Sequence, residues 1–262
     1  MALFTDGVIS TLDELAAQDS AVLETANSEG IDVTAKLAMA QSEIGAQIVA
    51  ASNRAPLAPI GFSNWWPGIL PTTGPQLNSI AVTPPLQLWH TFHTLELVYR
   101  DAYYSQLNDR YLGKWNTYKD LTKWAYELLN QTGLGIVADP IGAAQTPQLK
   151  AVAGVLSPGA YFVQVSWLNL HGEEGVPSPV TSLELSTNGS LEVTPLNAPT
   201  NSLAWNVYVG CSIESVGLQN NAPLRSTEPW TVPASGLLSG RPPGNGQVPN
   251  YYRQLPRYLQ RG

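Results

Sequence analysis

The fold of the first half of the chain is decided by residues 86–133, which read LQLWHTFHTLELVYRDAYYSQLNDRYLGKWNTYKDLTKWAYELLNQTG. Apolar residues recur there every three or four positions, through Leu88, Phe92, Leu95, Tyr99 and Ala102 and then through Leu112, Trp115, Tyr118, Leu121, Ala125 and Leu128. This spacing predicts two long amphipathic helices, each with one apolar stripe. Residues 108–110, Asn-Asp-Arg, and Gly113 lie near the junction of the two series and weaken helix propensity. The chain is therefore expected to form either a tight corner or a kink there, and the corner is favoured because a helical hairpin buries both apolar stripes against each other.

The composition narrows the class of protein. Only 13% of the 262 residues are charged, about half the usual share, and so low a charge is often found where partners cover much of a surface. The net charge of −7 argues against general binding of nucleic acid. Cys211 is the single cysteine, so no internal disulfide is expected. The first residues do not resemble a secretory signal, and no apolar run is long enough to cross a bilayer. These features favour a soluble protein that folds in cytosol-like conditions.

Two further helices are expected before the hairpin. Thr11 and Glu14 fit a capping box, which predicts a helix that starts there and ends near Asn27–Gly30. A second helix is predicted from near Asp32 or Thr34 to about Asn53. With the hairpin, these elements predict an N-terminal helical bundle over residues 1–147.

A proline-rich crossover, residues 54–85, lies between the two pairs of helices. Its seven prolines disfavour helix and central strand. Trp65 and Trp66 lie in it and are costly to leave in water. They are expected either to pack on the protein's own bundle or to belong to an arm that lies on a neighbouring subunit.

From about Gln148 the pattern changes to period-two alternation. Tyr161, Val163, Val165 and Trp167 point one way, and the residues between them point the other way. Further strands are expected at 181–185, 191–194, 204–209 and 224–232, and Gly, Pro and Asn punctuate them. The chain is therefore predicted to be an α+β protein with a β-sandwich over residues 148–234.

The β half resembles an immunoglobulin-like or fibronectin type III module. The resemblance lies in the strand 159–167, GAYFVQVSW, in the turn 169–175 followed by Pro177 and Ser178, and in the strand 205–210, WNVYVG. It implies a fold and little about function, because such modules serve adhesion, spacing and display.

The layout of the whole chain is similar to that of the head-to-tail connector, or adaptor, proteins of tailed bacteriophages. Residues 89–101, WHTFHTLELVYRD, residues 107–111, LNDRY, and Lys114 with Trp115 suggest it. The resemblance implies a virion structural protein without catalysis, which forms a homo-oligomeric ring of about twelve copies under the capsid portal. The implied partners are the portal protein, a tail or nozzle protein and, passively, DNA in the channel, with no membrane. Virion localisation is implied, with host cytoplasm during assembly. The subunit interface is expected to involve the aromatic residues Trp65, Trp66, Tyr111, Trp115 and Tyr118.

Residues 235–262 are predicted to be an extended, basic docking tail. Pro242–Pro249 can form neither helix nor ladder. Tyrosine and arginine are residue types that anchor interfaces. We expect the partner-binding residues to be Tyr251, Tyr252, Arg253, Arg257, Tyr258 and Arg261. The alternatives are a frayed terminus and weak contact with packaged DNA.

Few residues of the sequence are candidates for catalysis or metal binding. His90, His93 and Glu96 have a spacing that could hold a divalent ion, but a fourth ligand is missing. The two histidines are instead expected at the polar border of the helix stripe, and Glu173 and Glu174 are expected to be solvated turn charges. Nucleophile elbows, phosphate loops and CxxC pairs are absent from the sequence. We therefore expect no enzyme, no metal and no cofactor. The alternative function is a surface adhesion module that binds glycan or protein through its sandwich, carried by a helical anchoring domain.

Overall fold

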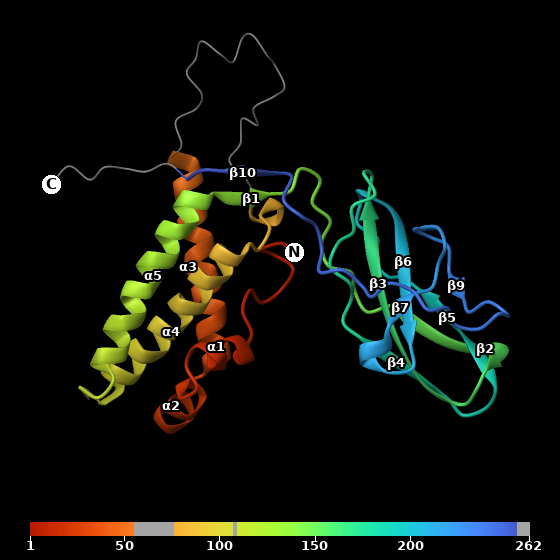
Figure 1. Cartoon of the computed structure of the whole chain (residues 1–262), viewed down its shortest axis with the longest axis horizontal. Helices are drawn as coiled ribbons and strands as arrows, with labels where there is room; N and C mark the ends of the chain where they lie inside the picture. Colours follow the sequence, from red (N-terminus) through yellow and green to blue (C-terminus); the bar gives the residue numbers. More distant parts are fainter. Residues whose placement is uncertain (55–75, 107–108, 256–262) are drawn as a thin grey trace, which may run out of the picture. The chain divides into compact units, whose positions relative to one another are not determined.

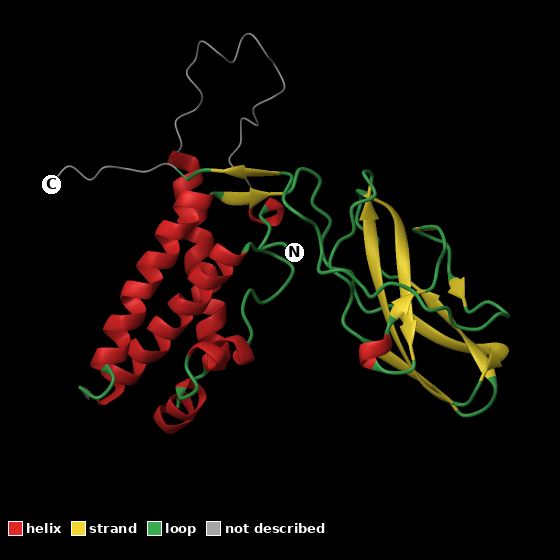
Figure 2. Ribbon diagram, viewed as in Figure 1, coloured by secondary structure: helices red, strands yellow, loops and turns green. Residues whose placement is uncertain are grey.

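The structure is a computed structural model that describes residues 1–54, 76–106 and 109–255. It is an α+β protein, with helices in the N-terminal half and antiparallel sheets in the C-terminal half (Figures 1 and 2). The chain divides into two compact units. The helical unit comprises residues 7–136 and the chain from residue 249 onward, and the β unit comprises residues 1–6 and 137–248.

These units differ from the predicted domains 1–147, 148–234 and 235–262. The chain passes between the units at residues 6/7, 136/137 and 248/249. Leu3 and Phe4 are buried in the β unit, and the carboxylate of Asp6 accepts a hydrogen bond from the backbone N of Ala143 at 2.9 Å. Each unit is therefore completed by a terminal segment that is distant from it in sequence.

The first helices of the helical unit are α1 (Leu12–Gln18) and α2 (Val22–Glu29). The capping box is confirmed, since Glu14 N donates to Thr11 Oγ1 and Thr11 N donates to Glu14 Oε2. The single helix predicted up to residue 27 is wrong, because the chain breaks after Gln18. Asp19 leaves the helical conformation there, and its side chain accepts a hydrogen bond from Ala21 N at 3.0 Å.

The long helices follow the predicted pattern. They are α3 (Val33–Arg54), α4 (Pro84–Gln106) and α5 (Leu112–Thr132). The corner is confirmed, since α4 and α5 are separate helices that pack against each other along their length (Figure 1). Gly133 ends α5 with a φ of 87°, a value that favours glycine. The short 3₁₀ helix η1 (Leu77–Ser79) precedes α4, while residues 55–75 of the proline-rich crossover lie outside the described residues.

One prediction about α4 needs correction. Instead of a single apolar stripe, α4 is buried on most of its circumference from Leu86 to Ala102. It packs against α3, α5 and α2, and more lightly against α1. A helix surrounded by others is buried all round, so α4 is the central helix of this unit.

The helical unit also contains a small antiparallel sheet. Its strands are β1 (Leu134–Ile136) and β10 (Tyr251–Arg253), and Ile80 bridges to Ile136 on the other edge of β1. The pairing of β1 with β10 joins segments that are more than one hundred residues apart, and the sequence pattern did not predict it. Within the predicted extended tail, residues 251–253 form a strand, and the pairing of this strand with β1 was not predicted. Residues 235–248, which belong to the β unit, contain neither helix nor strand.

The β unit contains two antiparallel sheets. One has the order β2-β5-β9, and the other has the order β4-β3-β6-β7 with β8 also paired to β6. The bounds are β2 (Gln148–Leu156), β3 (Gly159–Asn169), β4 (Thr181–Leu185), β5 (Gly189–Thr194), β6 (Ser202–Gly210), β7 (Gly217–Leu218), β8 (Leu224–Arg225) and β9 (Trp230–Thr231), with the 3₁₀ helix η2 (Ile213–Ser215) after β6.

The predicted alternation along β3 is confirmed. Tyr161, Val163, Val165 and Trp167 are all buried, and they join Trp205 of β6 and Val193 of β5 in one apolar core. Burying aromatic and branched side chains between two sheets is the main source of stability for such a unit. The strand predicted at 224–232 is instead divided into β8 and β9.

Candidate functional site

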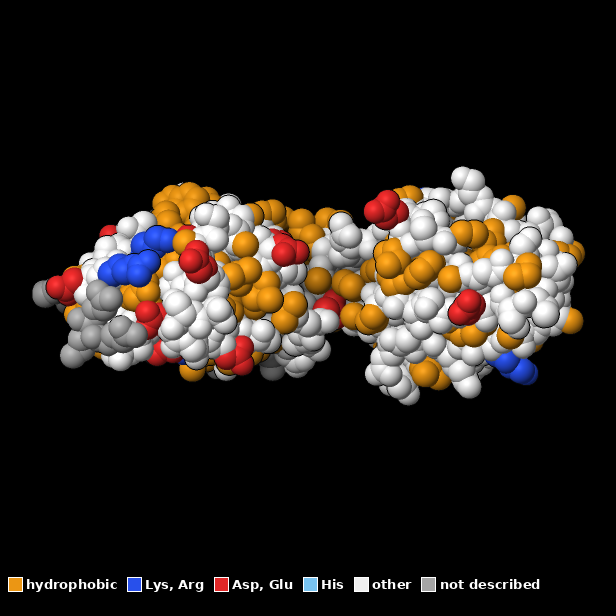
Figure 3. All heavy atoms as spheres, turned by 90° about the horizontal axis from the view of Figure 1, so that it is seen from below, with side chains coloured by type: hydrophobic (Ala, Val, Ile, Leu, Met, Phe, Trp, Pro, Cys, Tyr) orange, Lys and Arg blue, Asp and Glu red, His pale blue; other side chains and the backbone are white. Residues whose placement is uncertain are grey.

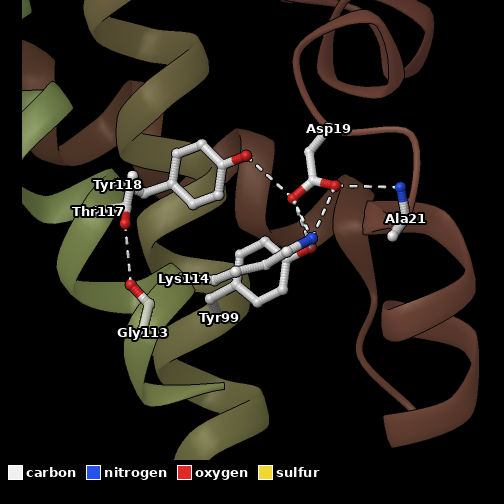
Figure 4. A network of polar contacts seen from close by, with 7 residues as sticks. All are labelled: Asp19, Ala21, Tyr99, Gly113, Lys114, Thr117 and Tyr118. Atoms are coloured by element: carbon white, nitrogen blue, oxygen red, sulfur yellow. Dashed lines mark hydrogen bonds and ion pairs between the residues drawn. The ribbon is translucent and has the colours of Figure 1, made fainter. Parts of the chain in front are cut away.

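A buried carboxylate joins the helices of the helical unit (Figure 4). The Oδ2 atom of Asp19 accepts hydrogen bonds from the hydroxyls of Tyr99 at 2.7 Å and Tyr118 at 2.9 Å. Lys114 Nζ donates to both carboxylate oxygens, at 2.9 and 2.7 Å, and also to the Tyr99 hydroxyl at 3.0 Å. We call Asp19, Tyr99, Lys114 and Tyr118 the Asp19 network. It links the α1–α2 turn to both helices of the hairpin.

The pKa shifts agree with this geometry. Burial by itself would raise the pKa of Asp19, but hydrogen bonds from Lys114, Tyr99, Ala21 and Tyr118 outweigh burial and hold that pKa below its usual range. Burial and the neighbouring Asp19 carboxylate both raise the pKa of Tyr118. The network is therefore an ionised carboxylate with neutral tyrosines, an arrangement that fixes helices in place.

His90 lies inside the unit rather than at the border of the helix, so that prediction was wrong. Its Nε2 donates to the carbonyl of Leu37 on α3 at 3.1 Å, because a carbonyl oxygen can only accept. Its Nδ1 then accepts from the Ser10 hydroxyl at 2.9 Å. Burial lowers the pKa of His90 to about 4, so the ring is neutral near pH 7. Both ring nitrogens are engaged within the protein, which leaves neither for a metal ion.

His93 is buried one turn further along α4 and joins two carboxylates. Its Nε2 lies 2.7 Å from Glu43 Oε2 of α3, and its Nδ1 lies 3.3 Å from Glu96 Oε2. Burial opposes the charge, but hydrogen bonds to Glu96 and Glu43 outweigh it and raise the pKa of His93. The three side chains are thus an ion-paired link between α3 and α4. The described parts of the chain contain no cluster of three or more acidic, histidine or cysteine side chains suited to a metal ion.

The two histidines should give the helical unit opposite pH dependences. The raised pKa of His93 contributes stability that is complete below about pH 6.5 and is lost as the pH rises through the folded pKa. The lowered pKa of His90 has the reverse effect, since stability falls as the pH drops from about 6.5 towards 4. In His93→Gln, the loss of stability on the alkaline side should disappear and the loss on the acid side should remain. Urea unfolding, followed by helical circular dichroism across this range, tests it. An unchanged alkaline slope in the variant would contradict the ion-paired assignment.

The structure distributes the aromatic residues predicted at the subunit interface over different environments. Tyr111 and Tyr118 are buried within the helical unit. Trp115 is half-buried and stacks on Tyr103, with 5.5 Å between ring centroids. Trp65 and Trp66 lie outside the described residues. Of this set, only Trp115 presents part of its side chain at the described surface.

Two other exposed surfaces were missed at the level of sequence. One is a face of α3 without charge, and we call it the α3 face. Its residues are Ala35, Ala38, Met39, Ser42, Ala46, Val49 and Ala50, all exposed. Their spacing of three and four positions places them on one side of the helix. The signal in the sequence is the series of alanine residues along this helix.

The second surface lies on α5. Trp124 is 51% exposed there, although its ring still contacts Phe92 of α4 at 6.3 Å between centroids. The partly buried residues Leu121 and Leu128 lie three and four positions away, on the same side of α5. We call these three residues the α5 face. Because α4 packs against both α3 and α5, the two faces belong to helices that flank the central helix.

The C-terminal residues predicted to bind a partner are described up to Leu255. Tyr251 and Tyr252 are exposed in β10, and Arg253 is half-buried. Arg257, Tyr258 and Arg261 lie outside the described residues. The two tyrosines are therefore accessible on a strand that is fixed at the helical unit.

The β unit has a second hydrogen-bonded carboxylate, that of the half-buried Glu174, which we had expected to be a solvated turn charge. It accepts hydrogen bonds from Ser166 and Tyr208, from Asn206 at 3.2 Å, and from Arg241 at 2.6 Å. Burial would raise the pKa of Glu174, but these donors outweigh burial and lower it. Arg241, which lies in the predicted extended, basic docking tail, is thus attached to the sheet.

Charged side chains are sparse on the face shown in Figure 3, where apolar and neutral side chains cover most of each unit. Among the described residues, no helix is long and apolar enough to cross a membrane. No protein family, no curated protein and no solved structure matches the chain.

Proposed function

We propose that this chain is a structural protein of a tailed-bacteriophage virion, which forms a ring that connects the capsid portal to the tail. One observation carries the proposal: the helical unit presents the α3 face, which is made of small and apolar side chains, and the α5 face, which presents the exposed Trp124, on helices that flank α4. A ring is built from head-to-tail contacts, in which one patch of each subunit binds a different patch of the next. Two such faces on one unit meet that requirement.

The two faces differ in the size of their side chains. The small side chains of the α3 face, such as Ala38, Ser42 and Ala46, leave room for a large neighbouring group. The α5 face offers one in Trp124, a residue type that is common at the centres of interfaces. A stable protein–protein interface buries about 800 Å² of surface on each partner. Residues beside the two faces would therefore also have to be buried in the contact.

The β unit is an immunoglobulin-like module in this proposal. Two antiparallel sheets with Trp167 and Trp205 buried between them support it. The module would contact a tail or nozzle protein. The C-terminal segment, with Tyr251, Tyr252 and Arg253 leading to Arg257, Tyr258 and Arg261, would dock on the portal, and DNA would pass through the ring. The protein would then be assembled in the host cytoplasm and retained in the virion.

The test is assembly. Native mass spectrometry and electron microscopy of the full chain, alone and with its portal, should show a closed ring. The double variant Met39→Glu, Ala46→Glu should abolish it, because two carboxylates would be buried without partners. The control is Gln47→Glu, which places one carboxylate on exposed α3 beside the α3 face and should leave the ring intact. Helical circular dichroism shows that each variant folds.

Two results would overturn the proposal. The first is a strictly monomeric wild-type chain in the presence of the portal. The second is an intact ring in the folded double variant, which would remove the α3 face from the contact.

A further inference from the structure

The C-terminal segment Pro249–Leu255 is bound to the helical unit as a separate peptide would be. Its strand β10 pairs with β1 in antiparallel register, with Tyr251 opposite Ile136 and Arg253 opposite Leu134. Asn250 N adds a hydrogen bond to Ile136 O at 2.8 Å. Adding an extended segment to the edge of an existing strand is a common way for proteins to bind peptides.

Two apolar residues fix the ends of this segment. A Cβ atom on Gly135 would lie 2.7 Å from Pro249 Cγ, so only glycine allows so close an approach at this position. At the other end, Leu255 is buried. Between these anchors, Tyr251 and Tyr252 are 47% and 56% exposed. The segment is therefore held by backbone hydrogen bonds and two anchors, and the tyrosines take little part.

Apart from the edge that binds the segment, β1 is already held by the rest of the helical unit. β1 is buried along its length, and its other edge is already occupied, since Ile80 bridges to Ile136 and Ala81 N donates to Gly135 O at 3.0 Å. The same segment from another copy of the chain could therefore pair with this edge of β1 and occupy the same two anchor positions.

The connection that leads into the segment is very short. The β unit holds the chain as far as Gln247, whose side chain accepts from Ile141 N at 2.7 Å and donates to Asp139 O and Glu173 Oε2, both at 2.9 Å. The helical unit holds it again from Pro249 onward. Only Val248, 70% exposed, lies between. Short connections of this kind favour exchange of a terminal element between identical subunits.

We propose that in the assembled protein Pro249–Leu255 of one copy pairs with β1 of a neighbouring copy. The inference rests on the proposed ring. An exchanged segment makes the same contacts that it makes within one chain, so exchange costs little in contact energy. It also ties each subunit to the next, and each β1 edge is completed by the neighbour.

A paired cysteine variant tests the exchange. Ile136 and Tyr251 are directly opposite, and opposite residues of antiparallel strands lie at a Cα separation that suits a disulfide. The experiment uses the full chain with Ile136→Cys, Tyr251→Cys and Cys211→Ser, since Cys211 is exposed and free. After oxidation of the assembled protein, a denaturing, non-reducing gel should show a ladder of covalent oligomers.

The matched control pair is Lys150→Cys with Glu192→Cys, two residues that are opposite each other on β2 and β5 within the β unit. This pair should give covalent monomers only. Covalent monomers, or no disulfide, from the 136/251 pair in an intact ring would overturn the exchange and leave the ring proposal standing. Monomers in native mass spectrometry would reject the ring itself, and the exchange with it. A ladder from a protein that forms no closed ring would support exchange and reject the ring.

Discussion

Replacing Asp19 by Ala is expected to lower the free energy of unfolding of the helical unit by roughly 2–4 kcal/mol. The substitution leaves the hydroxyls of Tyr99 and Tyr118 without their common acceptor, and it leaves Lys114 without its ion-pair partner. The two tyrosines are buried, so they cannot exchange the lost bond for a bond to water. The ammonium group of Lys114 is partly exposed, which moderates its share of the loss.

The control for this substitution is Asp120→Ala. Asp120 also pairs with a lysine, Lys123 at 3.1 Å, but both side chains are well exposed. Such pairs contribute at most about 1 kcal/mol. Urea unfolding followed by helical circular dichroism compares the two variants, and equal effects would refute a structural role for the Asp19 network.

Asp19 should also make the stability of the helical unit depend on pH. The lowered pKa of Asp19 means that its contribution is present above the unfolded pKa of about 3.9. The contribution is lost as the pH falls through the folded pKa. Asp19→Asn should therefore reduce stability at neutral pH and make acid unfolding of the helical unit less steep.

Replacing Glu174 by Ala is expected to destabilise the β unit by roughly 2–4 kcal/mol. Ser166, Asn206 and Tyr208 would lose a shared charged acceptor on the sheet, and Arg241 would lose its ion pair. The segment that contains Arg241 should then protect the sheet edge less, because Leu218 N donates to Arg241 O there at 2.9 Å.

Hydrogen exchange measured on peptides from β3, β6 and β7 tests this prediction, because it reports the loss of backbone protection within the β unit. Glu184→Ala is the matched control, because Glu184 is exposed on β4 and its loss should change protection by less than about 0.5 kcal/mol. Unchanged protection in Glu174→Ala would mean that Glu174 does not hold the segment against the sheet.

The burial of polar residues shows where sequence patterns stop being informative. The spacing of His90 and His93 suggested a helix border, because a stripe at the period of a helix has polar residues at its margins. Instead α4 is surrounded by helices, and Ser10, Leu37 and Glu43 supply partners from segments 50 to 80 residues away in sequence. Local spacing contains no information about such partners. Glu174 was misassigned for the same reason, since its donors come from β3, β6 and Arg241.

The sequence alone determined the local elements of this protein. Capping at Thr11, apolar spacing along α3 and α5, Gly133 after α5 and alternation along β3 all depend on neighbours within a few residues, and the structure confirms them. Only the tertiary structure decided the division into units, the central position of α4 and the pairing of β1 with β10. Those features depend on which distant segments meet, and a backbone edge accepts a strand largely irrespective of its side chains. For this reason the tyrosines of the C-terminal segment could be recognised in the sequence, while the strand that holds them could not.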